Sequence, residues 1–156
     1  MKRKIIALGF ACMASGALAG NVAPGNVTFT DGAVQTSLTG APGDPVRGRE
    51  VVGDKSQGNC VACHANSEMS EIPFHGEIGP PLDGAGERWS EAQLRGMLVN
   101  AKNMFPGTMM PAFYKVDGFT RPGDDYTGTA APADLDPILT AQQIEDVVAY
   151  LSTLKY

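Results

Sequence analysis

The stretch GNCVACHANSEMSEIPFHGEIGPPLDG, residues 58–84, contains two cysteines and both histidines of the 156-residue chain. Cys60, Cys63 and His64 form a C-x-x-C-H motif. In such a motif both thiols form thioether bonds to a haem and the histidine ligates the iron. The motif therefore predicts one covalently bound haem c with His64 as the proximal ligand. A thioredoxin-like redox pair is the alternative, but the adjacent histidine and the lack of a βαβ pattern favour haem.

The first nineteen residues have the pattern of a secretory signal peptide. A basic start, KRK at residues 2–4, precedes an apolar run, and ALA at residues 17–19 is a small-x-small cleavage pattern. No later segment approaches the roughly 20 apolar residues of a membrane span, so none is expected. Because Cys12 lies in this segment, Cys60 and Cys63 are the only cysteines of the exported chain, and no disulfide framework is expected.

Length and charge indicate one domain that does not bind nucleic acid. The residues after the signal are too few for more than a single domain with an appended arm. Three of the twelve basic residues and none of the seventeen acidic residues lie in the signal, so the exported chain has a net charge of −8 before haem is counted. This balance argues against a nucleic-acid partner and leaves a basic protein partner open.

Residues 20–43 are expected to form an extended amino-terminal arm. They are rich in Gly, Thr, Asn and Pro and show no helical period. The arm is either a floppy terminus or a strap that lies on a partner or around the haem domain.

Three helices are predicted after the arm. Asp44 is a good N-cap, and Pro45 suits the first position of a helix that ends near Lys55. Capping boxes at residues 90–93 (S-x-x-Q) and 140–143 (T-x-x-Q) each precede an apolar stripe at helical spacing. They predict one helix over about a dozen residues, ending near residue 102, and a last helix that closes the chain.

The segment between Pro111 and Pro137 carries many Gly, Pro and Asp residues without a sustained period. It predicts a long ordered loop, with room for a short hairpin, on one face of the haem. No strand-rich sheet is visible. Together these patterns predict an all-α haem domain over residues 44–156, with long loops and the extended arm.

His64 needs a hydrogen-bond acceptor at its second ring nitrogen, because that bond sets the tautomer and the orientation of the ring. The loop GPPLDG at residues 79–84 contains two prolines, which donate no hydrogen bonds, so its carbonyl groups are free. We expect the Pro80 carbonyl to be the acceptor; a plain tight turn is the alternative.

The sixth iron ligand has several candidates. They are His75, Met69, Met97, Met104, Met109 and Met110. Met69 and His75 follow His64 so closely that reaching the opposite haem face would require wrapping the haem edge at once. We therefore expect His75 to be a loop residue near the haem edge or at a partner surface. Met97 lies on the apolar stripe of its helix and is assigned to packing.

The stretch FPGTMMPAFY, residues 105–114, is the better source of the distal ligand. Its prolines and glycine fix a turn, and a methionine directly before Pro111 is held in an extended backbone. We therefore expect Met110, and not Met109, to bind the iron. Thioether ligation favours ferrous iron and raises the potential, which suits a haem that receives electrons.

The order of these motifs resembles the class I cytochromes c across residues 44–156. C-x-x-C-H is followed by GPPLDG, a capped helix, a methionine-proline loop and the terminal helix IEDVVAYLSTL. Four longer stretches are similar to the SoxX family, the monohaem subunits of SoxAX cytochrome complexes. They are LTGAPGDPVRGREVV, FHGEIGPPLDGAGERWSEAQLRGML, FPGTMMPAFYKVDGFTR and PILTAQQIEDVVAYLSTL. Residues 123–136 depart from the family pattern, because they are longer and more acidic.

The resemblance implies a heterodimer with a SoxA cytochrome in the periplasm. Such a complex oxidatively joins thiosulfate to a cysteine of a sulfur-carrier protein, which is an L-cysteine S-thiosulfotransferase activity. With both exported cysteines bound to haem, this chain has no thiol for the sulfur chemistry, and no catalytic residue is expected in it. One haem stores one electron, so the chain should relay electrons singly to an electron-accepting cytochrome. This acceptor and the carrier protein are expected to bind transiently.

Two other functions stay open on the sequence. The first is a free-standing periplasmic electron-carrier cytochrome c, although such carriers have little outside the haem fold, whereas this chain has an arm and a long loop. The second is peroxidase-like catalysis, which needs an open sixth position at the iron.

Overall fold

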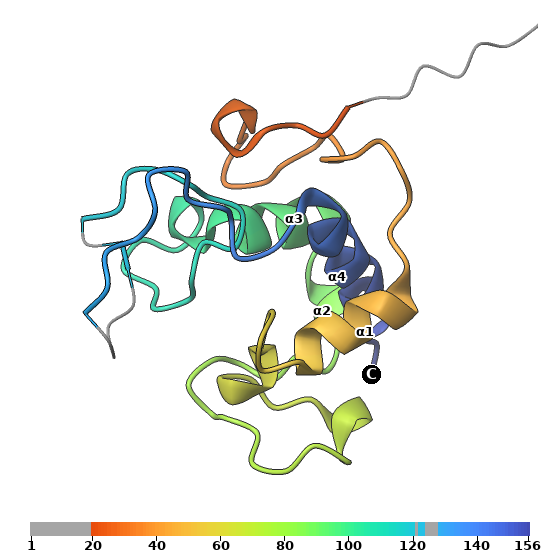
Figure 1. Cartoon of the computed structure of the whole chain (residues 1–156). Coiled ribbons are helices and arrows are strands. Elements are labelled where there is room, and N and C mark those ends of the chain that lie inside the picture. Colours follow the sequence, from red (N-terminus) through yellow and green to blue (C-terminus); the bar gives the residue numbers. More distant parts are fainter. Residues whose placement is uncertain (1–19, 121, 124–127) are drawn as a thin grey trace, which may run out of the picture.

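The computed structural model describes residues 20–120, 122–123 and 128–156. The expected signal peptide lies outside these residues, as do residues 124–127 of the acidic segment. The helices are α1 (Pro45–Gly53), α2 (Ala85–Arg88), α3 (Glu91–Asn100) and α4 (Ala141–Thr153) (Figure 1). Short 3-10 turns cover Pro24–Asn26, Cys60–Ala62, Ser67–Met69 and Ala101–Asn103. The described residues contain isolated β-bridges but no sheet, so the all-α prediction is confirmed.

Helices α1 and α4, which lie near the two ends of the predicted haem domain, cross in close contact (Figure 1). Asp44 begins α1, because its carboxylate accepts backbone hydrogen bonds from the first turn. Gly48 is buried at the crossing, where an added Cβ would overlap the backbone carbonyl of Asp146. The missing side chain therefore allows the two backbones to approach. The predicted start of α1 is confirmed, whereas its end comes at Gly53, slightly earlier than expected.

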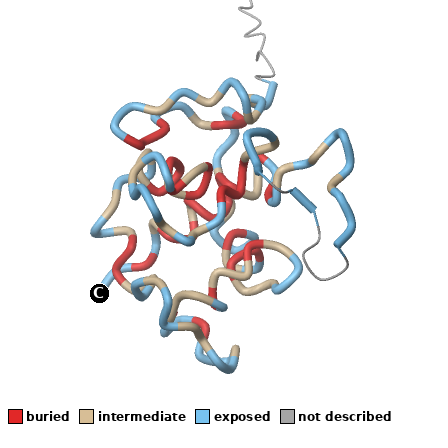
Figure 2. Tube along the Cα trace, turned by 90° about the vertical axis from the view of Figure 1, so that its left-hand side faces the viewer, coloured by how far each residue is buried: buried red, intermediate tan, exposed pale blue. Residues whose placement is uncertain are grey.

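Both predicted capping boxes are present. The side chains and backbones of Ser90 and Gln93 bond reciprocally at the start of α3, and Thr140 and Gln143 do the same at the start of α4. The apolar stripe of α4 is fully buried in the core, and Figure 2 shows buried residues gathered along the central helices. The four-residue helix α2 was not predicted, because it is too short to show a helical period.

The amino-terminal arm lies across α3 and α4 and is not a free terminus (Figure 1). Arg95 of α3 and Glu145 of α4 form a buried bidentate ion pair, with N–O distances of 2.8 and 2.9 Å. The arm bonds to both partners. The Leu38 N–H donates to Glu145 Oε1 at 2.7 Å, and the Val34 carbonyl accepts from Arg95 Nη1 at 3.0 Å. The arm thus supplies hydrogen bonds that a buried ion pair needs.

The start of the segment after α3 is bonded to that helix, and the Leu139 amide, just before α4, donates to the Phe113 carbonyl. The Phe113 and Tyr114 amides donate to the carbonyls of Leu98 and Val99, in the last turn of α3. The carbonyls of the last helical turn have no N–H partner within the helix, so the loop supplies hydrogen-bond donors to the end of α3. Of the described residues, no helix is long and apolar enough to cross a membrane.

Candidate haem site

The attachment motif folds as a tight turn. The 3-10 turn Cys60–Ala62 is closed by the amides of Cys63 and His64, which both donate to the Cys60 carbonyl, at 3.0 and 2.9 Å. Cys60 and Cys63 are not joined to each other by a disulfide. Burial raises the pKa of Cys60 to about 12. A thiol with this pKa is protonated at neutral pH, which is the reverse of the low pKa found in thioredoxin-like redox pairs.

The ring of His64, the predicted proximal ligand, is oriented by the GPPLDG loop, as expected from the sequence. His64 Nδ1 lies 2.6 Å from the Pro80 carbonyl oxygen. A carbonyl only accepts, so Nδ1 carries the proton and the lone pair of Nε2 is free to bind a metal. Gly79 allows this arrangement, because a Cβ at this position would overlap the His64 ring.

Arg88, at the end of α2, holds the same loop from the other side. Its Nη2 donates to the Pro81 carbonyl at 2.8 Å, and its Nη1 donates to the Tyr156 hydroxyl at 3.0 Å. The loop that orients His64 is thus fixed between α2 and the carboxyl terminus. No pattern in the sequence pointed to Arg88, because its role depends on a fold that brings α2 next to the prolines.

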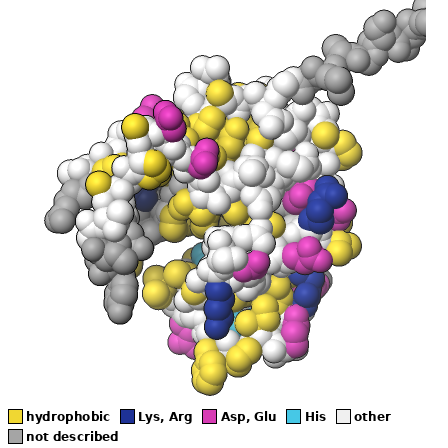
Figure 3. All heavy atoms as spheres, viewed as in Figure 1, with side chains coloured by type: hydrophobic (Ala, Val, Ile, Leu, Met, Phe, Trp, Pro, Cys, Tyr) yellow, Lys and Arg dark blue, Asp and Glu magenta, His cyan; other side chains and the backbone are white. Residues whose placement is uncertain are grey.

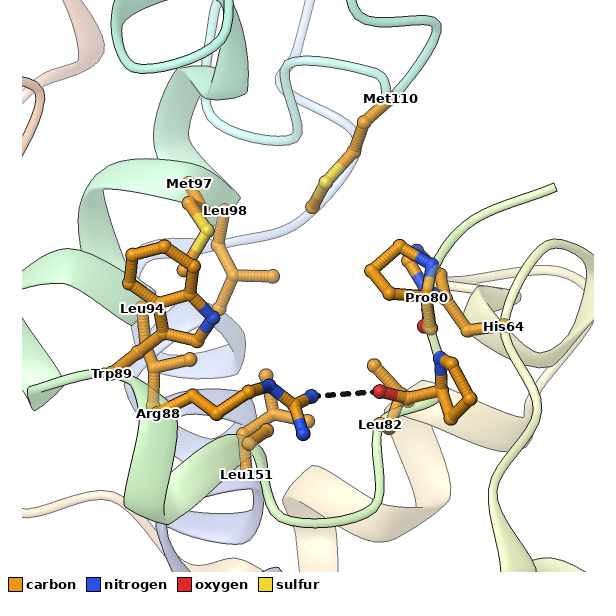
Figure 4. A pocket seen from close by; sticks show the side chains of 12 residues that line it. His64, Pro80, Leu82, Arg88, Trp89, Leu94, Met97, Leu98, Met110 and Leu151 are labelled. Carbon is orange, nitrogen blue, oxygen red and sulfur yellow. Dashed lines mark hydrogen bonds between the residues drawn. The ribbon is translucent and has the colours of Figure 1, made fainter.

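His64 and Met110 line one hollow (Figure 4). In the close view the Met110 side chain points into the hollow from the loop after α3, and the Pro80 loop with His64 forms another wall. The remaining lining is mostly apolar and comes from the proline loop, from α2 and the residue after it, and from α3 and α4. It comprises Pro81, Leu82, Ala85, Arg88, Trp89, Leu94, Met97, Leu98 and Leu151. Figure 3 shows hydrophobic side chains around this recess from outside.

These residues fit a haem. An apolar porphyrin needs apolar walls, and the iron needs a ligand on each side of the ring plane. The hollow offers both, with an imidazole nitrogen and a thioether among its lining residues. The cysteines lie in the turn that directly precedes His64, so a group attached to them enters the hollow from that side.

The other candidate methionines lie differently. Met109 is 81% exposed, whereas Met110 is half-buried and packs against the core. Met69 is fully buried under the Ser67–Met69 turn and does not line the hollow. Met97 packs against the core, as expected, and its side chain also lines the hollow.

His75 is not among the residues that line the hollow. Its Nδ1 accepts a hydrogen bond from the backbone N–H of Asn66 at 3.2 Å, and its Nε2 is buried without a partner among the described residues. The Asn66 side chain in turn donates to the Tyr150 hydroxyl of α4 at 2.9 Å. His75 therefore belongs to a network that ties the segment after the haem motif to α4.

Comparison with known proteins agrees with this geometry. The sequence model of the cytochrome c family, described as "Cytochrome c", matches residues 45–155. The chain belongs to the cytochrome c family. Cytochromes c carry covalently bound haem c. The hollow lined by His64 and Met110 is the candidate site for this cofactor.

A solved structure gives a closer likeness. This cytochrome c is 58% identical to a chain of SoxXA from P. pantotrophus, with a TM-score of 0.84. The match covers 88% of this chain and 100% of the SoxXA chain. The resemblance to SoxX that the sequence motifs indicated is confirmed by this match. No curated protein sequence matches the chain.

Proposed function

We propose that this chain is the monohaem electron-transfer subunit of a SoxAX complex. The identity of 58% over the whole of a SoxXA chain carries the proposal. The partner is then a SoxA cytochrome. The complex acts as an L-cysteine S-thiosulfotransferase, which oxidatively couples thiosulfate to a cysteine of a sulfur-carrier protein. Residues 1–19 would direct export to the periplasm, where the complex would work.

Cys60 and Cys63 would hold one haem by thioether bonds, and His64 and Met110 would supply a nitrogen and a sulfur to its iron. When bound, this group supplies one-electron transfer, and a thioether ligand favours its ferrous state. The protein would orient the His64 ring and would exclude water from the cofactor. The Pro80 carbonyl keeps the proton on His64 Nδ1, which supports this assignment, and the apolar walls reduce access of solvent to the iron.

The reactive groups of this chain support a role in electron transfer and not in the sulfur chemistry. Apart from Cys12 in the expected signal, both cysteines serve haem attachment, so no thiol is left for a mixed disulfide. Coupling thiosulfate to a thiol releases two electrons, while one haem stores one. The subunit therefore takes electrons singly and passes them to an electron-accepting cytochrome that binds transiently.

Reconstitution tests the proposal. Isolated holoprotein mixed with thiosulfate and the carrier-protein cysteine should make no conjugate. Addition of the SoxA cytochrome should produce both conjugate and haem reduction. Catalytic conjugation by the isolated chain would contradict the relay role. If the pair fails while this haem exchanges electrons rapidly with an oxidase, a free-standing electron carrier is the correct function.

The axial ligand has its own test. The ferric holoprotein should show the weak sulfur-to-iron absorption band of methionine ligation. Met110→Ala should abolish this band, and the matched variant Met109→Ala should retain it because Met109 is exposed. The reverse pattern would assign the ligand to Met109.

A further inference from the structure

Lys102 follows α3 in a rigid position. The helix ends at Asn100 and continues as the 3-10 turn Ala101–Asn103. The Asn100 side chain caps this turn by accepting a hydrogen bond from the Lys102 amide at 3.3 Å. The backbone of Lys102 is therefore fixed by the end of a core helix, although its side chain reaches the surface.

The ammonium of Lys102 bonds to the residue proposed as the distal ligand. Lys102 Nζ donates to the Met110 carbonyl at 2.8 Å. The Met110 amide donates to Thr108 Oγ1 at 3.3 Å, which is a bond within the loop itself. Among the described residues, this bond from Lys102 is the side-chain hydrogen bond that joins the Met110 backbone to the end of α3.

Backbone hydrogen bonds anchor the loop before and after Met110, but none of them involves Met110 itself. After it, Phe113 and Tyr114 bond to the end of α3, and the Phe113 carbonyl accepts from the Leu139 amide. Before it, the Phe105 amide bonds to the Ala101 carbonyl. Between these anchors the Met110 amide bonds to the Thr108 hydroxyl within the loop, and Lys102 ties the Met110 carbonyl to the end of α3. A hydrogen bond from a charged donor is stronger than a neutral one, which suits this task.

We propose that Lys102 is a positioning residue for Met110, which keeps its thioether directed into the haem hollow and strengthens the bond to iron. This inference rests on the proposed axial role of Met110. Without the Lys102 bond, the Met110 peptide can rotate and the thioether leaves the hollow more often. A competing ligand then reaches the iron more easily, and the positive charge that favours the reduced haem is also lost.

The test uses the holoprotein and imidazole as a competing iron ligand. Lys102→Met removes the donor and the charge but keeps an unbranched side chain. Lys55→Met is the matched control, because it removes one surface charge in the turn after α1, away from the loop that carries Met110. Lys102→Arg keeps a charged donor. For each protein we would measure the dissociation constant of imidazole, the sulfur-to-iron band and the reduction potential.

Lys102→Met should bind imidazole about fivefold more tightly than the wild type, the factor for losing one hydrogen bond of ordinary net strength. Its reduction potential should fall further than that of Lys55→Met, and Lys102→Arg should restore most of the imidazole resistance. Equal imidazole affinity in Lys102→Met and Lys55→Met would overturn the proposal. A sulfur-to-iron band that survives Met110→Ala would instead overturn the ligand assignment, so the two failures are distinguishable.

Discussion

Replacing Gly48 by alanine tests the crossing of α1 and α4. The new Cβ would overlap the Asp146 carbonyl oxygen and would lie 2.8 Å from the Tyr150 Cβ. Both are parts of α4 that cannot rotate aside, so the helices must separate. Overpacking of this kind costs about 1–3 kcal/mol. Alanine is favoured over glycine in a helix by about 1 kcal/mol, which offsets part of the cost.

The expected net loss for Gly48→Ala is about 2 kcal/mol, at the upper end of overpacking less the propensity gain. This should lower the melting midpoint of the holoprotein by roughly 5 to 10 °C, followed by far-UV circular dichroism. Gly53→Ala is the control in the same helix, because its Cβ would meet the mobile ends of Ile72 and Met69 side chains. An equal or higher midpoint for Gly48→Ala than for Gly53→Ala would refute the close crossing.

Three further changes probe the ion pairs and His75. Glu145→Gln leaves the buried Arg95 without its counter-charge, so the free energy of unfolding should fall by about 3–5 kcal/mol in urea titrations; a loss below 1 kcal/mol would contradict this. Burial raises the pKa of Asp146, but hydrogen bonds from Arg47 and others outweigh burial and lower it below 3.8. The carboxylate therefore stabilises the fold above the unfolded pKa and loses this effect as pH falls through the folded pKa, so the stability gap between wild type and Asp146→Asn should narrow below about pH 4. His75→Ala should leave the ferric iron low-spin, whereas a high-spin spectrum would make His75 a ligand.

The sequence predicted those features that depend on neighbouring residues. The capping boxes at Ser90 and Thr140 and the Asp44 cap are read from three or four consecutive positions, and all three helices start where these signals place them. The haem motif and the proline loop are equally local. The geometry that Pro80 was expected to have with His64 is found in the structure, because a histidine in a fixed turn has few acceptors within reach.

The sequence predicted that the first and last helices cross at Gly48, but it did not predict several other contacts between distant segments. Arg95 and Glu145 are 50 residues apart, and neither sits in a pattern that marks it as buried and paired. The arm showed no period, so its two alternatives stayed open until its backbone was seen to bond to this pair. Nothing in the sequence distinguishes Lys102 from an ordinary surface lysine. Only its position at the end of α3 brings its ammonium to the Met110 carbonyl.

The contact between the first and last helices also determines when the fold can close. Asp44 bonds to Asp146 across a separation of 102 residues, so α1 gains its main partner only after nearly the whole chain has been made. The cysteines emerge much earlier than α4, while this contact is still missing. The thiols of Cys60 and Cys63 are then exposed with their ordinary reactivity. Late closure thus leaves an interval in which the thiols are accessible for cofactor attachment before packing restricts them.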